Sequence, residues 1–180
     1  MRKHESPAGG VSIAKIIAYA AAVFLLAVFT GSFAAKFKFF GAVPSYLLVL
    51  TVAAGFFEGE KTGSVVGLAS GFVADALGGV GISVLPLFYT LLGWGIGRGV
   101  QKFGHTGGAS ISERLLRWSI WHAIGCGVGM VITAVCLLLG AGKVNIFAAF
   151  FKMMLPEAFG SFIFGYPIGI VFMVVFRNRN

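Results

Sequence analysis

Residues 62–77 have the sequence TGSVVGLASGFVADAL, an apolar run in which Gly63, Gly67, Gly71 and Asp75 follow one another at steps of four. Positions four apart drift only about 40° around an α-helix, so these residues share one broad face. Small residues at this spacing let two helix backbones approach closely, which is how helices gain packing contact inside a membrane. The stretch therefore predicts a membrane helix whose glycine face packs against a neighbour.

The composition of the whole chain agrees with a membrane location. Hydrophobic residues make up 58% of the 180 residues and charged residues 11%, whereas a soluble domain is about one-quarter charged. So few charges cannot cover a water-exposed surface, and a chain of this length cannot bury all its apolar runs in one soluble core. The net charge of +8 comes from basic residues between apolar runs. That placement favours contact with anionic lipid headgroups over binding of nucleic acid.

Apolar runs recur along the chain and predict an all-α fold. We expect a polytopic integral membrane bundle of about six transmembrane helices in a single domain, residues 1–180. The first run is longer than the apolar part of a signal peptide, about 7–15 residues, so we expect it to be retained. The second run begins with Pro44, and a tight polar turn at residues 58–61 separates it from the third. Residues 144–155 mix Phe with polar residues and are expected to lie in the headgroup region. The expected spans are residues 11–35, 43–57, 62–77, 82–98, 115–139 and 156–176.

The distribution of Lys and Arg predicts the orientation, because cytoplasmic ends of membrane helices carry an excess of basic residues. With the N-terminus inside, six spans place ten basic residues in the cytoplasm and four outside. This favours a multi-pass protein of a cytoplasmic (inner) membrane with both termini in the cytoplasm. The cytoplasmic set is Arg2, Lys3, Lys15, Lys61, Arg98, Lys102, Arg114, Arg117, Arg177 and Arg179, and the outer set is Lys36, Lys38, Lys143 and Lys152.

Asp75 is the polar residue that most needs a role. A carboxylate inside a membrane helix costs about 2.5–3.5 kcal/mol on insertion scales, so it is a candidate functional residue. Three roles stay open: a structural anchor at outer-surface water or on the Gly78–Gly79 backbone, a contact with a partner or lipid, and binding of a proton or ion. Gly93 and Gly97 form another four-residue step and predict a second close-packing face. The expected packing and partner-binding residues are Gly63, Gly67, Gly71, Asp75, Gly93 and Gly97.

The remaining acidic residues and the cysteines have structural interpretations. Glu58 and Glu60 are interpreted as solvated residues of a cytoplasmic turn. Glu157 follows Pro156 in the first turn of the last helix, where a negative charge suits the helix dipole. Cys126 and Cys136 would lie about 15 Å apart along one helix, too far for a disulfide.

The histidines and the other glycine clusters predict no catalytic or metal site. His122 stands beside Trp118 and Trp121, a pattern typical of the aromatic belt at a membrane surface. The glycines of residues 93–99 and 125–129 do not follow a strand and lack the Lys-Ser/Thr pair of a phosphate-binding loop. We therefore expect a protein that is not an enzyme and that holds no metal and no cofactor.

The stretch from Val43 to Gly99 resembles the MreD family of rod-shape-determining membrane proteins. The resemblance rests on the apolar run after Pro44, the glycine helix closing on Asp75, a short glycine turn and the following apolar helix with its two glycines. Leu155-Pro156-Glu157, followed by an apolar span and a short basic tail, is also similar. The turn at residues 58–61 departs from the family pattern, because it is more acidic than the basic turn expected there.

This resemblance implies a non-catalytic scaffold subunit of the bacterial cell-elongation complex. Its partners would be an MreC-like single-span protein, the RodA glycosyltransferase, a class B penicillin-binding protein and the MreB filament. The helical plan is also similar to the substrate-binding subunits of energy-coupling-factor vitamin transporters, which is the alternative. A vitamin binder needs several polar side chains around an outer pocket, and the predicted outer half offers few. A channel would need polar faces on several helices, and these are missing.

Overall fold

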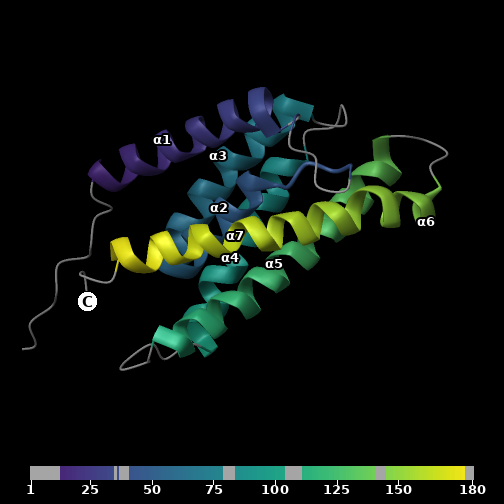
Figure 1. Ribbon diagram of the computed structural model, residues 1–180. Helices are drawn as coiled ribbons and strands as arrows, with labels where there is room; N and C mark the ends of the chain where they lie inside the picture. The colour runs from purple at the N-terminus through teal and green to yellow at the C-terminus, as the bar shows by residue number, and fades with distance from the viewer. Residues whose placement is uncertain are drawn as a thin grey trace, which may run out of the picture.

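The computed structural model describes residues 13–34, 36, 41–78, 84–103, 111–140 and 145–176, and these residues are helical apart from short connections. The all-α prediction is confirmed for this part of the chain. The elements in chain order are α1 (Ile13–Phe29), the π-helical turn η1 (Thr30–Ala34), α2 (Tyr46–Glu58), α3 (Glu60–Gly78), α4 (Leu85–Phe103), α5 (Ile111–Gly140), α6 (Ile146–Ala149), the π-helical turn η2 (Phe150–Met154) and α7 (Leu155–Phe176) (Figure 1).

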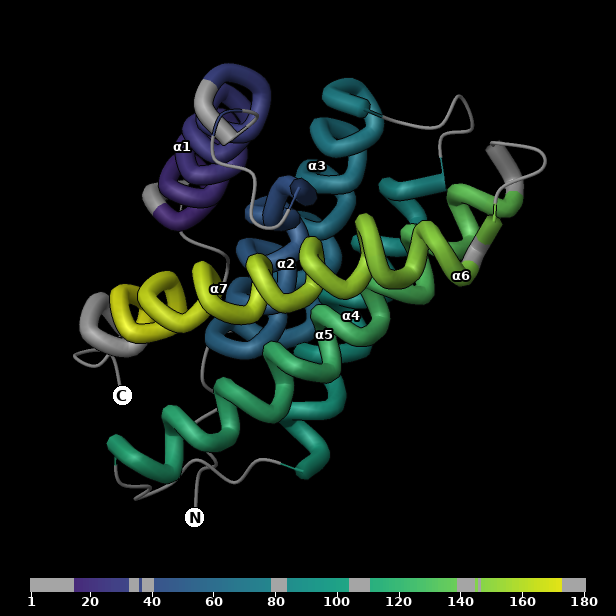
Figure 2. The backbone as a smooth tube through the Cα atoms, turned by 45° about the vertical axis from the view of Figure 1, so that its right-hand side comes forward, coloured from purple at the N-terminus to yellow at the C-terminus, as the bar shows by residue number. Residues whose placement is uncertain are grey.

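The helices are arranged around α2. Helices α3 and α4 pack on each other along their length and on α2, forming the most extensive contacts in the molecule. Helices α5 and α7 lie side by side and cross in front of α2, while α1 lies on the flank formed by α3 and α2 (Figures 1 and 2). The first residues of α1 and the last residues of α7 lie at the same end of the molecule (Figure 1).

Helix α2 is the centre because its sequence is apolar on every side. Each residue from Tyr46 to Gly55 is buried, and Val49, Val52 and Ala53 have no exposed surface at all. A helix that is hydrophobic all round has no face for water and is stable only when other helices surround it. Gly59, with φ at 92°, ends α2 and lets α3 begin one residue later. The tight turn predicted at residues 58–61 is therefore present.

Among the residues that the structure describes, three helical stretches are long and apolar enough to cross a membrane. Their qualifying stretches are Lys15–Ser32, Ile111–Leu138 and Phe147–Phe172, and α2 is a shorter apolar helix. Helices α3 and α4 have a lower hydropathy because they carry many glycines and several charges. The glycines of the contact between α3 and α4 are buried, whereas Lys61, Arg98 and Lys102 are exposed near the ends of these helices.

Several predicted boundaries differ from the observed ones. Helix α4 continues to Phe103 and α5 begins at Ile111, so helical structure extends beyond the apolar runs at both places. The Arg117 side chain donates a hydrogen bond of 2.9 Å to the Glu113 carboxylate one turn earlier, which stabilises the polar first turns of α5. The last helix begins earlier than expected, because α6, η2 and α7 form one continuous helical stretch from Ile146; whether its first part lies in the headgroup region stays a prediction. The following orientation residues lie outside the described part of the chain: Arg2, Lys3, Lys38, Lys143, Arg177 and Arg179.

Helix α1 is held to the centre by a buried ion pair. The Lys15 ammonium lies 2.5 Å from the Glu58 carboxylate at the end of α2, and the Glu58 side chain is only 9% exposed. Tyr19 and Val23, one and two turns further along α1, are also buried. The interpretation of Glu58 as a solvated turn residue is wrong because α1 covers it. Glu60 is more exposed and lies 3.8 Å from Arg98 of α4.

Replacing Glu58 by Gln is expected to lower stability markedly, because it removes the carboxylate that pairs with the partly buried Lys15 ammonium. We expect a loss of about 1–3 kcal/mol, seen as a lower melting temperature of the protein in detergent. Glu113→Gln is the matched control, since it breaks an exposed pair within one helix worth about 0.3–0.5 kcal/mol. Equal melting temperatures for the two variants would contradict an anchoring role for Lys15 and Glu58.

Candidate functional site

The glycine face of α3 rests directly on the backbone of α4. A Cβ atom added to Gly63 would lie 2.5 Å from the Gly93 carbonyl oxygen, and one added to Gly71 would lie 2.5 Å from the Cα of Pro86. A Cβ on Gly67 would overlap the backbone carbonyl of Tyr89. Only glycine leaves room for this approach, because the atoms that block a Cβ belong to backbone and cannot rotate away.

The glycines of α4 face the same contact from the other side. A Cβ on Gly93 would overlap the carbonyl group of Gly63, and one on Gly97 would lie 2.5 Å from the backbone of Gly59. Gly55 of α2 joins them, since its Cβ would lie 2.7 Å from the Gly93 carbonyl oxygen. We call this contact, formed by Gly55, Gly63, Gly67, Gly71, Gly93 and Gly97, the glycine seam. The structure thus brings the five glycines selected from the sequence together and adds Gly55.

Asp75 lies one turn beyond the glycine seam, near the end of α3. Its side chain is partly exposed, and no hydrogen bond or ion pair joins it to another residue that the structure describes. Gly79, the second half of the predicted backbone anchor, lies outside the described residues. The structure therefore separates Asp75 from the backbone contact that the five glycines make.

A second seam, which the sequence analysis did not identify, joins α5 to α7. Trp118 and His122 of α5 have no exposed surface, and their rings fill the space above two glycines of α7. A Cβ on Gly165 would overlap the His122 ring, and one on Gly169 would overlap the Trp118 ring. The prediction that His122 and Trp118 belong to a surface aromatic belt is wrong because α7 covers both rings. Gly165 and Gly169 are four residues apart, which is the same step that separates the glycines of α3, so this spacing could have predicted the contact from the sequence.

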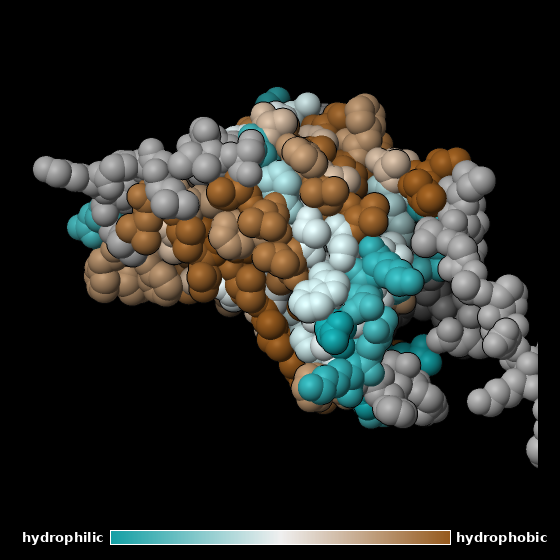
Figure 3. All heavy atoms as spheres, turned by 180° about the vertical axis from the view of Figure 1, so that it is seen from behind, coloured by the Kyte–Doolittle hydropathy of each residue, from teal (hydrophilic) through white to brown (hydrophobic). Residues whose placement is uncertain are grey.

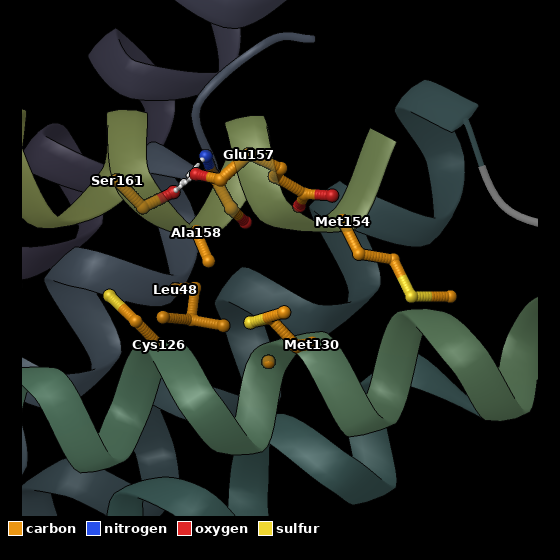
Figure 4. Close-up of a pocket in the computed structure, with 9 residues that line it drawn as sticks. Leu48, Cys126, Met130, Met154, Glu157, Ala158 and Ser161 are labelled. Atoms are coloured by element: carbon orange, nitrogen blue, oxygen red, sulfur yellow. Dashed lines mark hydrogen bonds between the residues drawn. The ribbon is translucent and has the colours of Figure 1, made fainter. Parts of the chain in front are cut away.

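A small pocket lies between α5 and α7 with α2 behind it (Figure 4). Met154 and Ala158 point from the C-terminal helical stretch toward Cys126 and Met130 of α5 (Figure 4). The pocket is partly open to the surface. Its lining residues are Ser45, Leu48, Cys126, Gly129, Met130, Met154, Glu157, Ala158 and Ser161.

The hydroxyl groups near this pocket are already hydrogen-bonded. The Ser161 hydroxyl donates to the Glu157 backbone carbonyl at 2.7 Å and accepts the Ser45 backbone N–H at 2.8 Å. The Ser45 hydroxyl shares a hydrogen bond of 3.1 Å with the Tyr89 hydroxyl. These bonds tie α7 to the start of α2 and to α4. The two serine hydroxyls of the pocket wall therefore already have hydrogen-bond partners within the protein.

The Glu157 carboxylate is the exception, because it has no hydrogen-bond or ion-pair partner among the described residues. Glu157 lies in the first turn of α7, as predicted, but the helix-dipole role expected there is not supported, because η2 precedes α7 and the backbone is already helical before Leu155. Glu157 lies ten residues after Phe147, the start of the membrane-length stretch Phe147–Phe172. Ten helical residues rise by roughly 15 Å, so the carboxylate lies near mid-depth of that stretch.

The part of the chain that the structure describes contains neither a metal-binding group of side chains nor a disulfide. No group of three His, Cys, Asp or Glu side chains is close enough there to hold a metal ion. Cys126 and Cys136 are both buried and free, which confirms the prediction that they form no disulfide.

No family model, curated protein or solved structure matches this chain. The functional argument therefore rests on the residues and on their geometry. Two features stand out: the glycine seam, which closes the centre of the molecule, and the unpaired Glu157 carboxylate in the pocket between α5 and α7.

Replacing Gly67 by Leu is expected to destabilise the protein, because the new side chain meets the Tyr89 backbone and forces α3 away from α4. Overpacking of this kind costs about 1–3 kcal/mol or more. Gly95→Leu is the matched control, since a Cβ on Gly95 of α4 has no atom within 4 Å. Melting temperature and the yield of monodisperse protein in detergent measure the effect. If Gly95→Leu were as damaging as Gly67→Leu, the close approach of the helices would not be its cause.

Proposed function

We propose that this protein is a non-catalytic membrane scaffold whose outer helices bind the membrane helices of partner proteins. The observation that carries the proposal is the contrast between a closed centre and a broad apolar exterior. The glycine seam leaves no space between α2, α3 and α4, whereas α1, α5 and α7 carry many large apolar side chains that are exposed. In the stretch Lys15–Ser32 of α1, only 11% of the residues are buried.

The exterior is apolar on several sides. Figure 3 shows a face whose left and upper parts are covered by hydrophobic side chains, with hydrophilic ones gathered from the centre to the lower right. Large exposed apolar residues include Ile17, Phe24 and Leu25 on α1 and Phe159 on α7. In a membrane such surfaces contact lipid or another protein, and shape complementarity decides between them. A bundle with several such helices can hold more than one partner helix.

The arrangement supports six membrane crossings with both termini in the cytoplasm. Lys15 at the start of α1, Glu58 at the end of α2 and Arg98 near the end of α4 lie at one end, as their ion pairs with neighbouring helices show. Gly59 also lies against the Gln101 side chain there. The chain therefore reverses direction between successive helices. We propose that this basic end faces the cytoplasm of a bacterial inner membrane.

We further propose that the complex served is the cell-elongation machinery that synthesises peptidoglycan. The resemblance to the MreD family supports this assignment, and the glycines on which the resemblance partly rests are those that form the seam between α3 and α4. The first partner would be an MreC-like single-span protein. The RodA glycosyltransferase, a class B penicillin-binding protein and the MreB filament would assemble with it.

The pocket favours the scaffold over the vitamin-binding alternative. Small-molecule sites usually have volumes of about 300–1,000 Å³ and several convergent polar groups. The pocket beside Glu157 has a volume of only about 10 Å³, enough for about one water molecule, and the hydroxyls of Ser45 and Ser161 are engaged in holding helices together. It offers one carboxylate and little else to recognise a polar vitamin.

Purification of the native protein from its own membrane in mild detergent tests the proposal. We expect mass spectrometry to identify a single-span coiled-coil protein together with wall-synthesis enzymes. A mock purification from cells lacking the tag gives the background. Recovery of paired ATPases with a second multi-span subunit would contradict the scaffold and favour a vitamin transporter.

A further inference from the structure

The Glu157 carboxylate lacks the counter-charge that its position requires. Ionisable residues within membrane spans are costly and almost always pair with another group or line a polar cavity. The basic residue nearest to it in the same helical stretch is Lys152, which is five positions earlier and exposed. No ion pair joins Lys152 to Glu157 among the described residues. Within the described residues the charge on Glu157 is unpaired.

The walls of the pocket restrict what can supply the counter-charge. A hard metal ion takes about six or more oxygen ligands, and the pocket has one free carboxylate beside serine hydroxyls that are already bonded. Most of the remaining wall consists of Leu48, Met130, Met154 and similar apolar groups. An apolar wall with one acidic group matches a chain of methylenes that ends in a positive charge. Lys and Arg have this form, since they bury their stems along apolar surfaces.

The surroundings of the pocket suit a helix that would carry such a side chain. Val131 of α5 and Phe150 and Met153 of η2 are large apolar residues that are exposed on the helices forming the pocket. Helices α5 and α7 lie side by side here, and the pocket between them is open on one side. A helix lying along this pair would place one of its side chains over the opening.

We propose that Glu157 pairs with one Lys or Arg side chain from a membrane-spanning helix of a partner protein, which docks along α5 and α7 over this small pocket. This inference rests on the proposed scaffold function and assigns one of its partner surfaces. The partner helix must carry a single basic residue near its middle. The pair would fix the depth and rotation of that helix, because an apolar contact alone allows it to slide.

A designed peptide provides the probe. Two fluorescent Leu-Ala peptides long enough to span a bilayer, about 20 residues, differ only in their central residue, Arg or Gln. Arg is used because it stays protonated in proteins. Energy transfer to labelled full-length protein in lipid nanodiscs measures their association. We expect the Arg peptide to bind the native protein at least about tenfold more tightly than the Gln peptide, equivalent to about 1.4 kcal/mol.

Glu157→Gln is expected to abolish this preference while leaving the melting temperature nearly unchanged, because the amide has the same shape as the carboxylate. Glu113→Gln is the matched control and should keep the preference. Equal binding of both peptides to the native protein would overturn the proposal. A second result would also overturn it. If replacing sodium by choline lowered the melting temperature of the native protein but not that of Glu157→Gln, the group bound at Glu157 would be a free cation.

The native partner separates this inference from the scaffold proposal. The inference requires that Glu157→Gln recover at least about tenfold less partner than the native protein does, matching the peptide result. Equal recovery would refute the pairing at Glu157 and leave the scaffold intact. If the native protein recovered no membrane partner while the Arg peptide still bound, the scaffold proposal would fail and the acidic pocket would stand.

Discussion

The contact of backbone with backbone between α3 and α4 is the constraint on which the rest of the structure depends. At Gly63 and Gly93 no side chain separates the two helices, and Gly55 brings α2 to the same point. In a membrane the hydrophobic effect does not drive helices together, so close packing over a long contact must supply the attraction. Glycines provide it because each missing side chain shortens the distance between helices and adds contacts along both backbones.

This central contact determines the roles of the other helices. Since α2, α3 and α4 fill the middle, α5 and α7 can only cross their surface, and α1 can only lie on the flank. The outer helices are attached by different contacts. Lys15 of α1 pairs with Glu58 of α2, and the rings of Trp118 and His122 of α5 pack onto glycines of α7. The large apolar side chains are left on the outside. The protein thus combines a rigid interior with the exposed apolar surface that a scaffold needs.

The sequence predicted the features that depend on local spacing. The glycine steps on α3 and α4, the apolar character of α2 and the turn at Gly59 all follow from residues at most a few positions apart. The polar residues were misjudged because their surroundings come from distant parts of the chain. Lys15 lies 43 positions before Glu58, and His122 is buried by Gly165. Glu157 was assigned a helix-dipole role because Pro156 suggested a helix start, but helical structure already precedes α7 through η2.

A double-mutant cycle on Gly63→Ala and Gly93→Ala tests the central claim most directly. The free energy of unfolding is measured for the native protein, both single variants and the double variant in mixed micelles. If the two backbones touch, the first methyl group forces the helices apart and the second then costs less. The account predicts that the double variant loses at least about 0.5 kcal/mol less than the sum of the single losses. Additivity within about 0.3 kcal/mol would contradict a direct contact between α3 and α4.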